Sequence, residues 1–491
     1  MPGTAPQNFT EGARIMRQNI LRAIFCLAVV FVSPLVPCRV SAQAVTTYPG
    51  ALPDGATYLI EVPPNWNGTL FLYSHEYVVP GSPNLAQDVG NPATRFFMLS
   101  TGFALAGSSY ATTNWAIQQA LPDQIAVLDI FAKTVGPPKV TIAWGHSLGG
   151  MITAGLIQRY PDRFAAALPM CGVLAGGVAT WNTGFDAAFA FKTLLAPGSG
   201  LQIVNITNPL ANLDRAESIL AAAQATPQGK ARLALAAALA DAPGWFTPLS
   251  PEPAANDFAA QEANQFLWDS EMDFPFLFAF RAELEARAHG NPSWNTPVDY
   301  RRRLQRSADA AEVRALYEQA GLALDADLKT LGETVRISAD PEATEYLEHN
   351  IIYNGEIHIP VLTLHTTGDG LVVVQNESAY WQVVREEGNG EFLRRTFVAR
   401  AGHCAFTPGE TTAAVQTLLA RLATGKWPDV DAASLTVVPA FVDFQPSVYL
   451  RPFDAEAEEC DSGRSCSERA SHLDLHRDDS SSLIRALQDW L

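Results

Sequence analysis

The sequence predicts an α/β protein in which a mostly parallel central sheet is flanked by helices and interrupted by a large helical cap or lid. Short apolar runs alternate with amphipathic helices over residues 43–175, and the same alternation returns over 356–454. Between these two parts, residues 176–355 are rich in Ala and Leu, and strand-like runs fade. Alternating strand and helix signals favour a parallel sheet, because a parallel connection needs a crossover that is usually a helix.

The expected elements follow one another in a regular order along the chain. The first core part contains one long amphipathic helix near 117–135 and four strand-like runs, at 69–73, 103–106, 139–144 and 165–169. The second core part contains a strand at 360–365, a helix at 377–384, a strand at 394–399 and a closing helix at 411–423. The insertion therefore divides one sheet rather than joining two domains.

The two ends of the chain differ from the rest in composition. Residues 1–42 have the pattern of a secretory signal, with Arg17 and Arg22 before an apolar run at 23–36 and small residues near position 42. The run is shorter than the roughly 20 residues that a membrane span needs. We therefore expect a secreted or periplasmic protein without a stable membrane span, an uncleaved anchor being the alternative. Residues 455–491 are acidic and Ser-rich, which predicts a disordered tail.

Charge and composition limit the partners. The formal net charge is −18, whereas nucleic acids and anionic membranes attract clustered Lys and Arg, so neither is expected as a partner. No Cys/His cluster has the spacing of a zinc site. We therefore expect no metal and no cofactor.

Four cysteines remain after the signal segment, namely Cys171, Cys404, Cys460 and Cys466. An even number in an oxidising compartment suggests disulfides, and four cysteines allow three pairings. We favour a local Cys460–Cys466 pair and a long-range Cys171–Cys404 pair, since the latter two should both lie at the carboxyl edge of the sheet. Two free thiols are the alternative for the long-range pair.

The strongest chemical signal is the pentapeptide Gly145-His146-Ser147-Leu148-Gly149. It stands directly after a β-branched strand and directly before an apolar helix, which is the context that a nucleophilic serine on a sharp strand-to-helix turn requires. Glycines are needed on either side because side chains there would collide with the neighbouring strand and helix. The motif predicts Ser147 as the nucleophile.

A serine hydroxyl needs a base within hydrogen-bond reach, and the base needs an orienting acid. His403 follows the last predicted strand, and we assign it as the general base. Asp369, flanked by glycines after the preceding strand, is the expected acid, with Glu377 as an alternative. His75 and His365 also lie at strand ends; His75 falls in the expected oxyanion loop, and His365 is expected to pack within the strand.

The order Ser147, Asp369, His403, carried by residues 69–176 and 361–423, resembles the α/β-hydrolase superfamily, in particular secreted lid-bearing esterases and peptidases. The resemblance implies an oxyanion hole formed by the amides of Leu148 and of a residue after the strand at 69–73. We expect Tyr77 to supply the second amide. Many members have a glycine where this chain has Glu76.

Three functional hypotheses remain open at this point. The first is hydrolysis of a small-molecule or polymeric carboxylic ester, with a hydrophobic or aromatic moiety, through an acyl-serine intermediate. The second is a secreted aminopeptidase or amidase with the same residues, in which cap carboxylates such as Glu262, Glu271 or Asp273 hold a free amino group. The third is a binding protein without turnover. The aromatic residues of the insertion either form its own core or line an apolar substrate cleft.

Overall fold

The computed structural model describes residues 44–428 and 441–453. The predicted signal segment, the predicted Cys460–Cys466 pair and the predicted acidic tail lie outside these ranges. Within 44–428 and 441–453, no helix combines the length and the apolar character that crossing a membrane would require.

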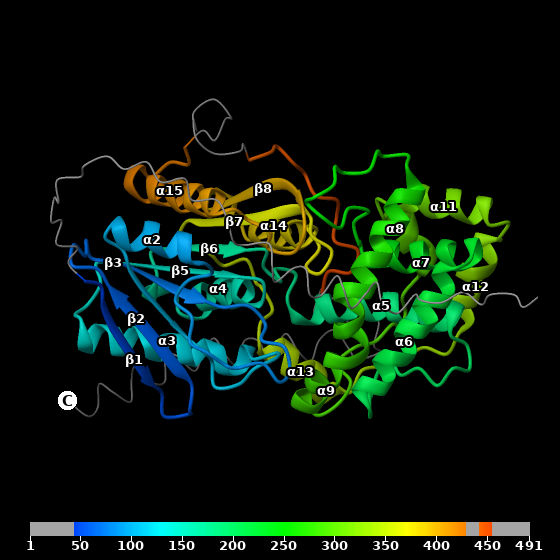
Figure 1. The fold of residues 1–491 in the computed structure, drawn as a ribbon, viewed down its shortest axis with the longest axis horizontal. Coiled ribbons are helices and arrows are strands. Elements are labelled where there is room, and N and C mark those ends of the chain that lie inside the picture. The colour runs from blue at the N-terminus through cyan, green and yellow to red at the C-terminus, as the bar shows by residue number, and fades with distance from the viewer. Residues whose placement is uncertain (1–43, 429–440, 454–491) are drawn as a thin grey trace, which may run out of the picture. The chain divides into compact units, whose positions relative to one another are not determined.

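The core is an eight-stranded sheet with the order β1-β2-β4-β3-β5-β6-β7-β8 (Figure 1). The strands are β1 (Thr46–Ala51), β2 (Thr57–Val62), β3 (Thr69–Ser74), β4 (Ala104–Ser108), β5 (Val140–His146), β6 (Ala166–Met170), β7 (Val361–Gly368) and β8 (Leu393–Ala401). Strand β2 is antiparallel to both of its neighbours, and every other pair is parallel. The predicted α/β class and mostly parallel sheet are thus confirmed, and the β1–β2 hairpin is an addition that the apolar runs did not reveal.

Helices cover both faces of this sheet. Their bounds are α2 (Pro92–Ser100), α3 (Ile117–Thr134), α4 (Leu148–Arg159), α14 (Asn376–Glu386) and α15 (Pro408–Thr424). Apolar side chains of α3, α4 and α14 pack in one buried cluster, and those of α2 and α15 pack in another. Strand β3 contributes to both clusters, with Leu70 and Leu72 in the first and Phe71 and Tyr73 in the second. Such a strand reads as a continuous apolar run because both of its faces are buried.

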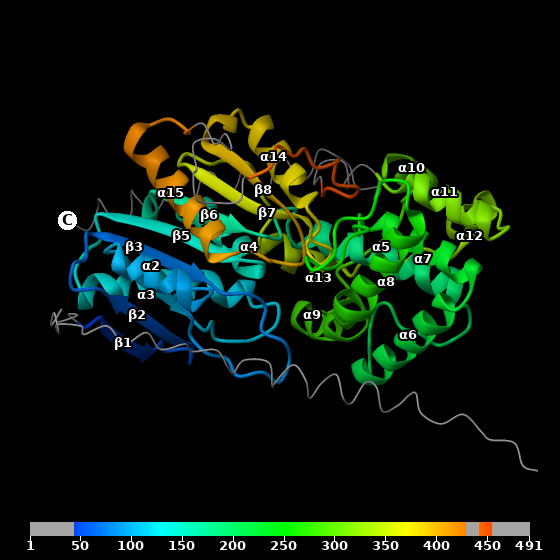
Figure 2. The same cartoon turned by 45° about the horizontal axis from the view of Figure 1, so that its top comes forward.

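The helical cap is inserted between β6 and β7. Its helices are α5 (Gly177–Leu195), α6 (Pro209–Gln224), α7 (Pro227–Leu239), α8 (Phe258–Trp268), η2 (Asp269–Asp273), η3 (Phe276–Phe280), α9 (Arg281–Ala288), α10 (Tyr300–Arg306), α11 (Ala310–Gln319), α12 (Leu324–Glu333) and α13 (Pro341–His349). The cap has its own apolar core, to which Phe185, Phe189 and Phe278 belong. Figures 1 and 2 show the cap at the end of the sheet toward which the parallel strands point.

Residues 441–453 form a segment that runs from beside β8 to the cap. It begins beside β8, where Phe444 packs edge-on against Phe397 at 5.4 Å between ring centroids. It ends in the cap, where the buried Arg451 forms an ion pair of 3.1 Å with Asp186 of α5 and donates to the carbonyl oxygen of Trp294. Because a buried charge is stable only when it is paired, this ion pair anchors the segment to the cap.

Candidate active site

Ser147 lies on a sharp turn between β5 and α4. Its backbone has φ 55° and ψ −122°, a conformation that side-chain-bearing residues rarely adopt and that persists only where the surroundings enforce it. The flanking glycines allow the turn, because a Cβ atom on Gly149 would lie 2.0 Å from the Ser74 carbonyl oxygen, and one on Gly145 would lie 2.5 Å from the same atom. The turn raises the serine hydroxyl above the carboxyl edge of the sheet, as the motif predicted.

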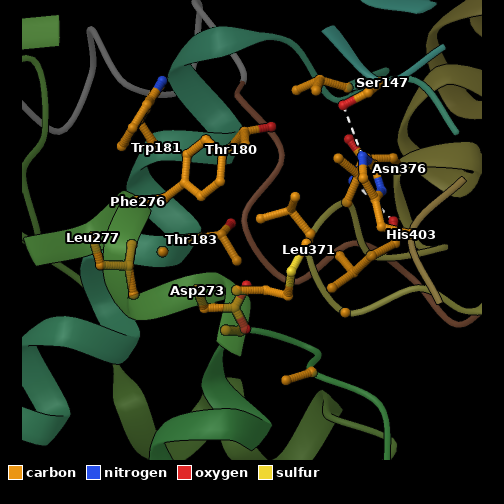
Figure 3. A pocket seen from close by; sticks show the side chains of 18 of the residues that line it. Ser147, Thr180, Trp181, Thr183, Asp273, Phe276, Leu277, Leu371, Asn376 and His403 are labelled. Atoms are coloured by element: carbon orange, nitrogen blue, oxygen red, sulfur yellow. Dashed lines mark hydrogen bonds between the residues drawn. The ribbon is translucent and has the colours of Figure 1, made fainter. Parts of the chain in front are cut away.

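A continuous chain of hydrogen bonds connects the three predicted residues. Nε2 of His403 lies 2.8 Å from Oγ of Ser147 (Figure 3). Nδ1 of the same ring lies 2.8 Å from Oδ2 of Asp369. Asp369 follows β7 and accepts a further hydrogen bond from the Val372 amide. The loops that bear the acid and the base are joined by the bond from Gly402 N–H to the Gly368 carbonyl. The imidazole is therefore oriented with one nitrogen on the acid and the other on the hydroxyl.

A second histidine and a second carboxylate lie behind Asp369. Nε2 of His365 donates to the Val372 carbonyl oxygen at 2.8 Å, and Nδ1 lies 3.2 Å from Oε1 of Glu377. Both ring nitrogens therefore face acceptors, which only a doubly protonated imidazolium can satisfy. Burial alone would lower the pKa of His365, but hydrogen bonds and attraction to Asp369 and Glu377 raise it to about 10. Glu377 was the alternative acid and His365 was expected to pack within the strand. In the structure His365 lies beside Asp369, and Glu377 contacts His365 rather than His403.

The groups around His403 shift its pKa in opposite directions. Burial lowers the pKa of His403, while attraction and hydrogen bonding to Asp369, and to a smaller extent the negative charge of Glu76, raise it above its ordinary value. His365 opposes this rise. Burial would raise the pKa of Asp369, but the two histidines hold it below its ordinary value, so the acid is ionised at neutral pH.

The residues expected to supply the oxyanion donors, Leu148 and Tyr77, line the same cavity as Ser147. Leu148 is the first residue of α4, and within the described residues neither its amide nor that of Tyr77 makes a hydrogen bond. His75, which is buried, lies two residues before Tyr77 in the same loop, and its ring stacks on Tyr110 with centroids 3.9 Å apart. A helix N-terminus with a free N–H is suited to stabilising negative charge that develops on a carbonyl oxygen.

The structure contains the Cys171–Cys404 disulfide, which spans 233 residues of sequence. Cys171 directly follows β6 and Cys404 directly follows His403. The bond therefore ties the base-bearing loop to the centre of the sheet.

A cavity of about 290 Å³ opens directly in front of the nucleophile, between core and cap. The lining side chains are mostly apolar, and Figure 3 shows Ser147 and His403 at one side and Trp181, Phe276 and Leu277 on the cap side. Trp181 and Phe276 are among the cap aromatics noted in the sequence. The two interpretations of those aromatics thus both apply, since other members form the core of the cap.

Several lining residues have no counterpart in the sequence motifs, and Tyr449 is the one that lies furthest along the chain. Tyr449 reaches the cavity from the segment 441–453, and burial raises its pKa to about 12. No local pattern marks it, because its position depends on the buried Arg451 that holds the segment against α5.

Comparisons with known proteins identify one substantial sequence relative. The chain is 31% identical to the o-phthalyl amidase of Xanthobacter agilis over 79% of this chain and 90% of that protein. No family model matches the sequence.

Solved structures are similar only at low identity. An acylaminoacyl peptidase of Pyrococcus horikoshii has 8% identity and a TM-score of 0.38. The match covers 79% of this chain and 43% of the peptidase chain. An esterase of Aspergillus oryzae has 14% identity and a TM-score of 0.39, matching 78% of this chain and 80% of its own. At the identity and coverage of the sequence relative, the chain is a hydrolase that belongs to the family of the o-phthalyl amidase from Xanthobacter agilis.

Proposed function

We propose that this enzyme hydrolyses amides and activated esters of small aromatic carboxylic acids through an acyl-serine intermediate. The observation that carries the proposal is the hydrogen-bonded series Ser147–His403–Asp369 at the side of a mostly apolar cavity of small-molecule size. Trp181 and Phe276 provide the aromatic surface on which a ring of the substrate would pack.

The reaction follows from the positions of these groups. Oγ of Ser147 attacks the substrate carbonyl carbon while Nε2 of His403 accepts its proton, and the carbonyl oxygen becomes negative beside the Leu148 and Tyr77 amides. His403 then returns that proton to the leaving amine or alcohol as its bond to the carbonyl carbon breaks. A water molecule, deprotonated by His403, attacks the acyl-serine, and collapse releases the acid and regenerates the hydroxyl.

Two considerations narrow the substrate. The sequence relative is an amidase for an aromatic acyl group by its name, and this similarity favours amides over esters as natural substrates. Hydrolysis of esters alone is the second candidate, favoured by the apolar lining of the cavity.

We further propose export across a membrane, which the predicted signal segment supports and with which a stable Cys171–Cys404 bond agrees.

The test compares four chromogenic substrates: the p-nitrophenyl ester and the p-nitroanilide of benzoic acid, and the same two derivatives of acetic acid. Wild type should cleave both benzoyl compounds with higher kcat/KM than their acetyl counterparts. Ser147→Ala should abolish all turnover, whereas Ser82→Ala, which changes an exposed serine, should retain it. Cleavage of the esters without the anilide would identify an esterase, and activity that survives in Ser147→Ala would refute the mechanism.

A further inference from the structure

One wall of the catalytic cavity carries three hydroxyl groups that the reaction steps do not use. Thr180 and Thr183 lie three residues apart on α5, so they share one side of the helix, and Tyr449 joins them from the segment 441–453. Figure 3 shows both threonines on the cap side of the cavity. Thr183 and Tyr449 are each only 4% exposed. These three residues, called the hydroxyl patch below, form a buried polar area in a mostly apolar cavity.

The threonines of the hydroxyl patch lack the hydrogen bond that is usual inside a helix. A helical threonine commonly donates to the carbonyl oxygen four residues earlier, as Thr153, Thr330 and Thr417 do at 2.7, 2.9 and 2.8 Å. By contrast, Oγ1 of Thr180 and Oγ1 of Thr183 have no hydrogen-bond partner within the described residues. Because a buried polar group without a partner costs free energy, these two hydroxyls are suited to a partner that arrives with the substrate.

The hydroxyl of Tyr449 lies near both of these unpaired groups. Burial raises the pKa of Tyr449 to about 12, and the hydroxyls of Thr183 and Thr180 oppose this rise. They are close enough to act on the phenol, yet neither lies in hydrogen-bonding geometry with it. The phenol is protonated at neutral pH and therefore has a proton to donate.

The indole of Trp181 indicates which kind of partner this wall requires. Trp181 lies between Thr180 and Thr183 in sequence and lines the same cavity, and its N–H has no acceptor within residues 44–428 and 441–453. A hydroxyl can donate or accept, but an indole N–H can only donate. The wall therefore has a surplus of donors, and an acceptor atom on the substrate would satisfy it.

Other polar side chains of the lining already have partners. Tyr77 donates to Oδ1 of Asn114 at 3.3 Å, and Asn376 donates to a backbone carbonyl oxygen at 2.9 Å. The indole N–H of Trp115 is unpaired, but this ring packs edge-on against Trp181 and so belongs to the same wall. Apart from the catalytic groups, the unpaired side-chain donors in the described part of the lining are thus gathered around α5.

The three cap carboxylates considered for binding an amino group lie in different places. Asp273 lines the cavity, where burial and neighbouring carboxylates raise its pKa well above its ordinary value, so it is uncharged at neutral pH. Glu262 lies 3.7 Å from Nζ of Lys230, and Glu271 is exposed outside the lining. None of the three is a charged group that would draw a substrate away from the hydroxyl patch.

Small residues leave space for a substituent beside the hydroxyl patch. Gly184 and Ala187 line the cavity one and four residues after Thr183 on the same helix. A substrate ring that packs on Trp181 would therefore bring a substituent on that ring to the hydroxyls.

We infer that Tyr449, flanked by Thr180 and Thr183, donates a hydrogen bond to an oxygen substituent on the aromatic ring of the substrate, and that this bond determines specificity. This inference rests on the proposed function, since it assigns the ring substituent for the same cavity. The threonine hydroxyls can donate to the phenol oxygen, which leaves the phenol proton for the substrate. An ether oxygen and a carboxylate oxygen both accept such a bond, and the test separates them.

The test compares p-nitrophenyl esters of ring-substituted benzoic acids in two pairs of similar shape: methoxy against ethyl, and carboxylate against isopropyl. Each pair is measured at the ortho, meta and para positions, with spontaneous hydrolysis subtracted. For at least one position, the ratio of kcat/KM within a pair should fall by about tenfold in Tyr449→Phe, and also fall in Thr183→Val. Thr193→Val makes the same change on α5 outside the lining and should keep the wild-type ratio.

A fall in the methoxy–ethyl ratio would identify a neutral acceptor, and a fall in the carboxylate–isopropyl ratio a carboxylate; either result supports the inference. Ratios that Tyr449→Phe leaves unchanged for both pairs at every position would overturn it. So would an equal fall in Thr193→Val, because the loss would then not come from the hydroxyl patch.

A second readout needs no turnover. The methoxy- and ethylbenzamides should shift the melting temperature of Ser147→Ala by different amounts, and adding Tyr449→Phe should remove the difference. Wild type that hydrolyses no benzoyl ester would refute the proposed function, whereas this difference would still support the hydroxyl patch as a binding site.

Discussion

The positive charge of His365, which lies beside Asp369, can be tested by replacing His365 with Gln. The side chain is fully buried, and a glutamine retains a donor for the Val372 carbonyl while the positive charge is lost. General base catalysis requires neutral His403, so kcat/KM falls at low pH with the pKa of His403 in the free enzyme. The acidic side of the pH profile, where kcat/KM falls, is called the acid limb. Any change in the charge near His403 should therefore shift the pH of this limb.

The size of the shift follows from the geometry. Nε2 of His365 and Nδ1 of His403 lie 3.6 Å and 2.8 Å from the same oxygen, Oδ2 of Asp369, so the two nitrogens are no further apart than these distances combined. Two positive charges about 6 Å apart, at an effective dielectric constant of about 20, repel each other by about 2.8 kcal/mol, or about 2 pKa units. His365 destabilises the protonated form of His403, so its loss should raise the pKa of His403.

We therefore expect the acid limb of His365→Gln to move to higher pH by about 1 to 2 units. The assay is the pH dependence of kcat/KM for p-nitrophenyl benzoate, with His358→Gln, which changes an exposed histidine, as the matched control. Circular dichroism and urea denaturation would show that the variant is folded. A folded variant whose acid limb coincides with that of wild type would refute the reasoning, because His365 would then carry no charge that His403 experiences.

Three further predictions concern the same site. Ser147→Ala should lower kcat by on the order of 10⁴-fold or more without changing the urea midpoint, and unchanged turnover would exclude this serine as nucleophile. Glu76→Gln should move the acid limb to lower pH, because the carboxylate helps to raise the pKa of His403, and a shift to higher pH would contradict that direction. The double variant Cys171→Ala/Cys404→Ala should lose about 2–4 kcal/mol of unfolding free energy in urea, and reductant should affect wild type but not the variant.

Most core elements could be predicted because their signals are local. Strands β3 to β8 appear in the sequence as apolar runs within a few residues of their observed bounds, since both faces of these strands are covered by helices. The β1–β2 hairpin gave no such run, because it lies at the edge of the sheet and β1 has no buried residue. Strand signals stop near 176 and resume after 355, and the structure has helices from Gly177 to His349 between β6 and β7.

The sequence by itself was enough to place the three candidate catalytic residues at the carboxyl edge of the sheet. Ser147, Asp369 and His403 each stand at the end of a predicted strand, and parallel strands bring their ends to one edge whatever the length of chain between them. Only the tertiary structure decided what surrounds these residues. The charged His365 depends on packing between β7 and α14, and the hydroxyl patch depends on how the segment 441–453 sits against the cap. The physical reason is that strand and turn signals act over a few residues, whereas pairing of buried charges and the lining of a cavity arise from segments far apart in the chain.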